Sequence, residues 1–171
     1  MSDERKRILV TGGAGFIGSH VSEALLRRGD YVIIVDDMND YYDTRLKLYN
    51  LSILKSSYPS TSLAVYNGDI VDRQLMADIF EREKPTHVCH LAARAGVRPS
   101  ISDPYIYVRT NIEGTTCLLD LSRACGIQNF VYASSSSVYG GSEKTMLSEE
   151  DVVNKPVSPY AATKATCELL A

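Results

Sequence analysis

Residues 11–18 read TGGAGFIG, directly after the apolar run Ile8-Leu9-Val10 and before a segment with helical periodicity. Gly12, Gly15 and Gly18 follow one another at intervals of three residues. Between a strand and a helix, the first glycine allows a tight turn and the second lets backbone N–H groups approach a pyrophosphate. The third lets the helix pack closely on the strand. The motif therefore predicts a dinucleotide site in a parallel α/β fold.

Short apolar runs alternate with longer helical patterns along the rest of the chain. Asp72 can cap one helix, and Ser158-Pro159 can start the last one. This alternation predicts a Rossmann-type doubly wound parallel sheet with helices on both faces. We expect strands over 7–10, 31–35, 63–66, 87–91 and 130–133, and helices ending near 28, over 43–55, after 72, over 103–125 and from 158 onward.

The last helical pattern reaches Ala171 without a stop signal. A doubly wound sheet of this kind usually continues to a sixth strand. We therefore expect residues 1–171 to form one dinucleotide-binding Rossmann domain that lacks the C-terminal strands and the substrate domain.

The composition is that of an ordinary soluble globular protein, with 44% hydrophobic residues, 23% charged residues and a formal net charge of −3 over 171 residues. This charge favours no nucleic-acid partner, and the N-terminal apolar run is too short for a membrane span. The four cysteines form no C-x-x-C pair. Cys89 lies between His87 and His90, but burial in the core is the favoured interpretation, so we expect no metal site and a reducing, cytoplasmic environment.

Asp36 ends the second expected strand. A carboxylate at this position is placed to accept hydrogen bonds from an adenosine ribose. Its charge, together with that of Asp37, would repel a 2′-phosphate. The pattern therefore favours NAD over NADP as the cofactor.

Tyr160 and Lys164 lie four residues apart at the start of the last expected helix, and so share one face. A phenol is a poor base near neutral pH, but a nearby ammonium favours its phenolate form. The pair therefore suits acid–base catalysis of an alcohol–ketone conversion. Ser134-Ser135-Ser136-Ser137 follow the fifth strand, at the carboxyl edge where such sheets bind ligands.

In this order, the glycine motif, the serine run and the Tyr–Lys pair resemble the extended short-chain dehydrogenase/reductase family over essentially all 171 residues. Within it, the chain is most similar to NAD-dependent nucleotide-sugar epimerases and dehydratases, above all to epimerases that act on UDP-glucuronate. The similarity is carried by residues 36–43, 91–100, 132–141 and 158–164.

The resemblance assigns a role to each matching position. Ser135 is implied to be the catalytic hydroxyl, Tyr160 the base and Lys164 its partner. The substrate contacts implied are Ser135, Ser136, Ser137 and Arg98. The implied cofactor contacts are Gly12, Gly15, Phe16, Ile17, Gly18, Asp36, Asp69, Ile70, Leu91, Ala92, Ala93, Asn111, Tyr160 and Lys164.

The implied reaction is 4-epimerisation of a UDP-sugar, with UDP-glucuronate and UDP-galacturonate as the expected pair. Tyr160 would deprotonate the sugar O4 while hydride leaves C4 for NAD. The 4-keto sugar would then rotate in the site, and hydride would return to its opposite face. Related dehydratases carry Asp-Glu directly after the catalytic hydroxyl, and decarboxylases carry Glu at the second of these positions. Here the two positions are Ser136 and Ser137, which disfavours elimination and could instead bind a carboxylate.

Several alternatives stay open at this point. The parent protein could be a UDP-glucose 4-epimerase, a decarboxylase or a dehydratase, and the chain alone could be a catalytically silent dinucleotide-binding fragment. Arg94, where relatives often have Gln, and Arg98 could contact an anion or lie on the surface. Asn111 could serve the active site or the fold, and Tyr41-Tyr42 could line the cofactor or pack a loop. The resemblance also implies a possible homodimer through the helices of Asn111 and Tyr160.

Overall fold

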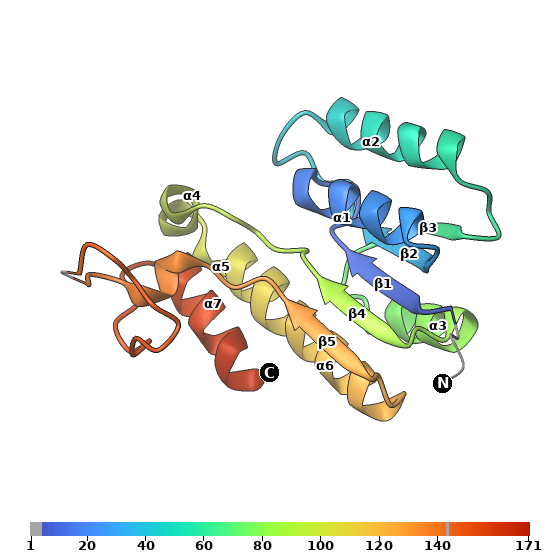
Figure 1. The fold of residues 1–171 in the computed structure, drawn as a ribbon. Helices are drawn as coiled ribbons and strands as arrows, with labels where there is room; N and C mark the ends of the chain where they lie inside the picture. Colours follow the sequence, from blue (N-terminus) through green and yellow to red (C-terminus); the bar gives the residue numbers. More distant parts are fainter. Residues whose placement is uncertain (1–4, 143) are drawn as a thin grey trace.

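The computed structural model describes residues 5–142 and 144–171, which form one parallel five-stranded sheet in the order β3-β2-β1-β4-β5 (Figure 1). The strands are β1 (Arg7–Thr11), β2 (Tyr31–Asp36), β3 (Leu63–Asn67), β4 (His87–His90) and β5 (Asn129–Tyr132). The chain crosses over between β3 and β4, so the loops after β1 and β4 diverge at the carboxyl edge of the sheet. Such a switch point is where doubly wound sheets bind ligands.

Helices connect the strands, as the alternating pattern predicts. They are α1 (Phe16–Arg27), α2 (Thr44–Ser57), α3 (Arg73–Glu83), α4 (Val97–Ser102), α5 (Pro104–Tyr107), the π-helix η1 (Val108–Glu113), α6 (Gly114–Ala124), the 3-10 helix η2 (Ser136–Tyr139) and α7 (Pro159–Leu170). Within residues 5–142 and 144–171, no helix combines the length and the apolar character needed to cross a bilayer.

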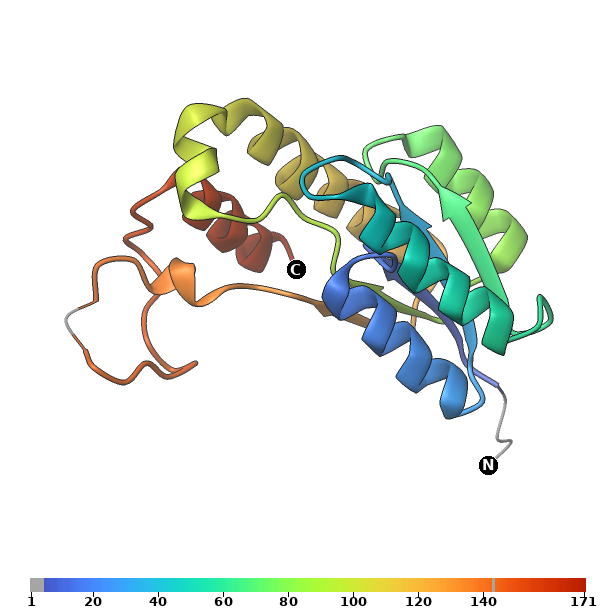
Figure 2. The same cartoon turned by 90° about the horizontal axis from the view of Figure 1, so that it is seen from above.

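Two hydrophobic cores lie on opposite faces of the sheet, because alternate residues of a strand point to opposite sides. Leu9 and Ile33 pack with apolar residues of α3 and α6, among them Phe80 and Leu118. Their strand neighbours form the second core with apolar residues of α1 and α2. The two views of the ribbon show these helix pairs covering the two faces (Figures 1 and 2). The predicted doubly wound architecture is therefore confirmed.

Two of the predicted helix starts are confirmed by their caps. The Asp72 carboxylate accepts a hydrogen bond from the Leu75 N–H at 3.0 Å. The Ser158 hydroxyl accepts one from the Ala161 N–H at 3.1 Å, and Pro159 follows at the first helical position. Since capping needs only a short polar side chain beside its own helix, it can be read from the local sequence.

The continuous helix expected over 103–125 needs correction. The segment is divided into α5, the π-helix η1 and α6, with Asn111 in the π-helical part. The Asn111 side chain is 2% exposed and hydrogen-bonds to the backbone of Arg94 in the loop after β4. π-Helical segments are rare, and helical periodicity does not distinguish them from a regular α-helix. The helix α4 was also not expected.

His90 is fully buried at the end of β4 and joins three elements. Its Nδ1 lies 2.7 Å from the Thr11 hydroxyl of β1, and its Nε2 lies 2.9 Å from the Thr115 hydroxyl of α6. Burial lowers the pKa of His90 to about 3, and the nearby Lys164 ammonium acts in the same direction. The imidazole is therefore neutral and serves the core, as the interpretation of this segment as buried implies.

Candidate functional site

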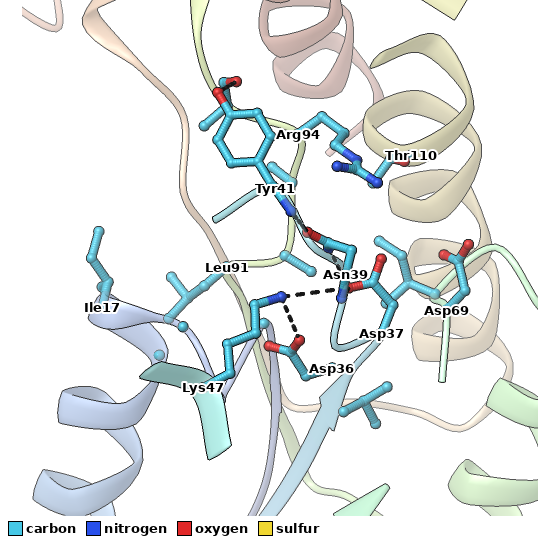
Figure 3. Close-up of a pocket in the computed structure, with 18 of the residues that line it drawn as sticks. Ile17, Asp36, Asp37, Asn39, Tyr41, Lys47, Asp69, Leu91, Arg94 and Thr110 are labelled. Carbon is cyan, nitrogen blue, oxygen red and sulfur yellow. Dashed lines mark hydrogen bonds and ion pairs between the residues drawn. The ribbon is translucent and has the colours of Figure 1, made fainter. Parts of the chain in front are cut away.

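A cavity of about 310 Å³ opens at the carboxyl edge of the sheet, between the loops that follow β1, β2, β3 and β4 (Figure 3). Eleven of the fourteen predicted cofactor residues line it, although they come from four separate segments. They are Gly12, Gly15, Phe16, Ile17, Gly18, Asp36, Asp69, Ile70, Leu91, Ala92 and Ala93.

The glycine loop (residues 11–18) has the geometry that the motif predicts. Gly12 has a φ of +69°, and a Cβ there would lie 2.8 Å from the backbone N of Ala92. A Cβ on Gly18 would lie only 2.1 Å from the Gly12 carbonyl oxygen. Glycine is therefore required at both positions for the turn and for the close approach of α1. The N-terminus of α1 begins at this loop, where its free N–H groups favour an anion.

The Asp36 carboxylate stands at the end of β2, as predicted, but most of its acceptor capacity is used within the protein. It accepts hydrogen bonds from the Ala14 N–H at 3.1 Å and the Met38 N–H at 3.0 Å. It also pairs with the Lys47 ammonium at 3.0 Å. Since a carboxylate offers about four acceptor positions, Asp36 has little more than one left for a ribose hydroxyl.

Lys47 lines the cavity, and the sequence analysis missed it. Its side chain is 5% exposed and also lies 3.8 Å from the Asp37 carboxylate, so one ammonium bridges two acidic side chains (Figure 3). A signal was present in the sequence, because Lys47 occupies the same helical stripe as the buried Leu51 and Leu54. A lysine in the apolar stripe of a helix calls for a buried partner.

Residues of the two loops beside the cavity complete its wall. The β2 loop (residues 37–43) contributes Tyr41 and Tyr42, and the Tyr41 hydroxyl donates to the Ala95 carbonyl oxygen at 2.8 Å. The β4 loop (residues 91–96) contributes Arg94, whose guanidinium lies 6.0 Å from the centre of the Tyr41 ring. Figure 3 shows Arg94 extending toward Thr110, away from Asp36 and Lys47. Arg98 is exposed on α4 and does not line the cavity.

Tyr160 and Lys164 lie one turn apart on α7, outside the cavity lining. The Lys164 ammonium is buried and donates to the Ala133 carbonyl oxygen at 2.8 Å. Burial lowers the pKa of Lys164. Because Ala133 itself lines the cavity, Lys164 is attached to the cavity wall from behind. The Tyr160 ring packs edge-on against the ring of Tyr107, with centroids 6.2 Å apart.

The serine run lies beside this helix, because η2 packs against α7. Ser135 caps η2, and its hydroxyl accepts a hydrogen bond from the Ser137 N–H at 3.2 Å. Ser134 pairs with Glu168 of α7, and Ser136 is exposed. The structure thus brings the predicted catalytic hydroxyl and the Tyr–Lys pair onto neighbouring elements, but Ser135, Ser136 and Ser137 do not line the cavity.

The third predicted cofactor residue outside the cavity lining is Asn111. Its side-chain oxygen accepts from the Arg94 N–H at 2.8 Å. Its side-chain nitrogen donates to the Arg94 carbonyl at 3.1 Å and to the Thr163 hydroxyl at 3.0 Å. Both ends of the amide are occupied by protein groups, which favours a role of Asn111 in the fold over a role in the active site. Asn111 holds the β4 loop and α7 at a fixed separation.

The sequence of this chain is similar to those of known proteins. The family model described as GDP-mannose 4,6 dehydratase matches residues 9–171. UDP-glucuronate 4-epimerase 1 of Arabidopsis thaliana is 48% identical over 162 residues, which are 94% of this chain and 37% of that protein.

Among solved structures, the UDP-glucose 4-epimerase of Thermus thermophilus in complex with NAD superposes with a TM-score of 0.81 at 35% identity. That of Thermotoga maritima with UDP-glucose superposes with a TM-score of 0.82 at 35% identity. Each match covers 96% of this chain and 49% of the solved one, so the chain spans half or less of the length of these relatives. The predicted kinship with nucleotide-sugar enzymes is confirmed, and the chain belongs to the family that the GDP-mannose 4,6 dehydratase model describes.

Proposed function

We propose that this chain binds NAD in the cavity and supplies the acid–base residues of a UDP-sugar 4-epimerase. The observation that carries the proposal is the convergence of eleven predicted cofactor residues, from four segments, on one cavity. The solved relative from Thermus thermophilus, which contains NAD, supports the choice of cofactor. The activity belongs to the whole protein of which such a chain forms the dinucleotide-binding part.

The residues present fit NAD. The glycine loop leaves no room for side chains at Gly12 and Gly18, and the α1 N-terminus offers its N–H groups to a pyrophosphate. Asp36, with its remaining acceptor position, and the Lys47 ammonium would hold the adenosine ribose. Asp69 and the buried Ile70 would lie against the adenine. Asp36 and Asp37 together carry two negative charges, and Lys47 carries one positive charge. The remaining negative charge would repel the 2′-phosphate of NADP, so NAD is preferred.

The chemistry follows from the α7 residues. Bound NAD would supply reversible oxidation at C4 of the sugar. The Tyr160 phenolate would take the proton from the 4-hydroxyl, and the resulting phenol would return it after the keto sugar has rotated. Lys164 would favour the charged form of that phenol, and Ser135 would hold the reacting oxygen. Each of these groups lies on or beside α7, which Asn111 and the Ala133 carbonyl hold against the cofactor wall.

The substrate we propose is UDP-glucuronate, converted to UDP-galacturonate. The similarity to a UDP-glucuronate 4-epimerase at 48% identity supports this choice over UDP-glucose. Ser136 and Ser137 offer hydroxyls for a carboxylate and no acid or base for elimination, which argues against a dehydratase or decarboxylase. A homodimer through the helices of Asn111 and Tyr160 remains a prediction.

A second candidate is that the 171-residue chain alone binds NAD without turnover. The lining of the cavity favours it, because Tyr160, Lys164 and Ser135 lie outside that lining. Catalysis needs a bound and oriented substrate, since a catalytic group contributes only when the reacting atom is held beside it.

Calorimetry with NAD and with NADP on the purified chain tests the cofactor proposal, with Asp36→Ala as the variant. We expect NAD to bind, NADP to bind more weakly, and Asp36→Ala to lose most of the NAD affinity while it keeps a cooperative thermal transition. No binding by the folded wild-type chain would overturn the proposal. Incubation with UDP-glucuronate and UDP-glucose, with the products separated by chromatography, then tests the second candidate. We expect little or no turnover by the chain alone, and detectable turnover would overturn this candidate.

A further inference from the structure

The β2 loop and the β4 loop form walls of the cavity that belong to distant parts of the sequence. Asp37, Asn39, Tyr41 and Tyr42 line it from the β2 loop, and residues 91–95 line it from the β4 loop. Among the described residues, a single hydrogen bond joins the two loops, from the Tyr41 hydroxyl to the Ala95 carbonyl oxygen. It spans 54 residues of sequence at a distance of 2.8 Å.

The acceptor side of this bond is held firmly. The Ala95 carbonyl also accepts the hydroxyl of Tyr107, which is 2% exposed, at 2.7 Å. The preceding residue, Arg94, has both its N–H and its carbonyl bound by the Asn111 side chain. The β4 loop is therefore fastened to α5 and η1 before Tyr41 reaches it.

The donor side is held by short local bonds. Within the β2 loop, the Asp37 carboxylate accepts from the Asn39 N–H at 3.1 Å, and the Asn39 side chain accepts from the Tyr41 N–H at 3.2 Å. Asp36 and Lys47 anchor the start of this loop. The Tyr41 side chain is 46% exposed, so its bond to the opposite wall can exchange with water. The β2 loop is thus the wall that can move.

Gly96 provides the space for this contact. A Cβ at Gly96 would lie 2.7 Å from the Tyr41 hydroxyl, and Gly96 has a φ of +98°, which disfavours other residues. The ring of Tyr41 also faces the Arg94 guanidinium at 6.0 Å (Figure 3). A glycine directly after Ala95 therefore leaves room for the Tyr41 hydroxyl to reach the Ala95 carbonyl.

We propose that Tyr41 is a cofactor-retaining residue, whose hydrogen bond to the Ala95 carbonyl closes the cavity over a bound dinucleotide and slows its release. The inference rests on the proposed function, because it takes NAD as the occupant. Release requires the β2 loop to part from the β4 loop, and this parting breaks the Tyr41–Ala95 bond. A cofactor that is regenerated in each turnover has no need to leave, so retention suits the proposed reaction.

The test compares Tyr41→Phe with Tyr107→Phe in the 171-residue chain. Each variant removes one hydroxyl from the same carbonyl, but only Tyr41 comes from the opposite wall. The dissociation rate of NAD is measured by stopped-flow displacement with excess ADP-ribose. We expect release about fivefold faster for Tyr41→Phe, the value of one ordinary hydrogen bond, and less than twofold faster for Tyr107→Phe. Amide hydrogen exchange of residues 38–42 without cofactor should accelerate in Tyr41→Phe alone.

The outcomes separate this inference from the proposed function. If the wild-type chain fails to bind NAD, both are overturned. If it binds NAD but Tyr41→Phe releases it at the wild-type rate, or if Tyr107→Phe accelerates release equally, the retaining role of Tyr41 is overturned and the cofactor site stands.

Discussion

The surroundings of the glycine loop and those of Tyr160 differ in how they are held. Around the glycine loop, β1 and β2 are buried along almost their whole length, and the loops that follow them line the cavity. Around Tyr160, the residues of β5 alternate between exposed and partly buried, with Val131 57% exposed, and the functional groups are side chains at η2 and on α7. The buried strands position most of the first region, and the Asp36–Lys47 pair adds to them, whereas the second depends on a few side-chain bonds such as Lys164 to Ala133.

The largest contrast between the regions should come from their lysine–carboxylate pairs. Lys47→Met leaves the Asp36 charge buried without its partner, so the free energy of unfolding should fall by about 3–5 kcal/mol. NAD affinity should fall about tenfold, because the same ammonium lines the cavity. Urea unfolding and calorimetry measure the two effects. Lys144→Met, which removes the exposed partner of Asp151, is the control and should leave the unfolding temperature unchanged. If Lys47→Met and Lys144→Met lost the same stability, the Asp36–Lys47 pair would contribute no more than an exposed ion pair.

Glycine substitutions should also separate the regions. In Gly18→Ala, the new Cβ would lie 2.1 Å from the Gly12 carbonyl, so the loop or α1 must shift. Overpacking of this kind costs about 1–3 kcal/mol, and the displaced loop should lose NAD affinity by roughly a hundredfold. In Gly141→Ala, in the segment between η2 and α7, the new Cβ would meet only the Val157 side chain at 3.9 Å, so the change should be close to neutral. A Gly18→Ala chain with normal NAD binding would show that the close approach is dispensable.

His90 bonds to Thr11 of the glycine loop and to Thr115 of α6, and its ionisation should make stability depend on pH. Its pKa is about 3 in the folded protein and about 6.5 when exposed, so the unfolded chain takes up a proton first as the pH falls. The stabilisation is complete above pH ~6.5 and decreases below it, by about 2 kcal/mol between pH 7 and pH 5. Urea unfolding at both pH values should show this loss in the wild type and in His20→Gln, an exposed histidine, but much less of it in His90→Gln. An unchanged pH dependence in His90→Gln would rule out this origin.

The smallest effects should come from helix caps, one in each region. Ser158→Ala and Asp72→Ala each remove one cap bond and should lower the free energy of unfolding by about 1 kcal/mol. Their local effects should differ. Because Tyr160 lies in the first turn of α7, Ser158→Ala should accelerate amide exchange at 161–163, whereas Asp72→Ala should do so at the start of α3. Thermal unfolding with hydrogen-exchange mass spectrometry measures both, and fraying of α7 in Asp72→Ala would contradict independent caps.

Features set by neighbouring residues could be predicted from the sequence, whereas those set by contacts between distant segments could not. Gly12, Gly18 and Asp36, which the sequence singles out, all line the cavity, because strand ends, glycine spacing and helix starts depend on neighbouring residues. The π-helical turn at Asn111 was predicted as regular helix, since its cause lies in the loop of Arg94. Arg94 itself was weighed as a surface residue, yet it lines the cavity. Lys47 was not considered, although its place in an apolar helical stripe was a readable signal.

The parallel sheet, the glycine turn and the starts of α3 and α7 can be predicted from local sequence, because steric limits and short-range hydrogen bonds act within a few residues. Three other features depend on long-range folding: Lys47 neutralises Asp36, Tyr41 bonds across the cavity to Ala95, and His90 stays uncharged. These arrangements join groups 11, 54 and 79 residues apart. Their free energies depend on burial and on the exact separation of charges and dipoles, which arise only when the sheet has brought distant segments together.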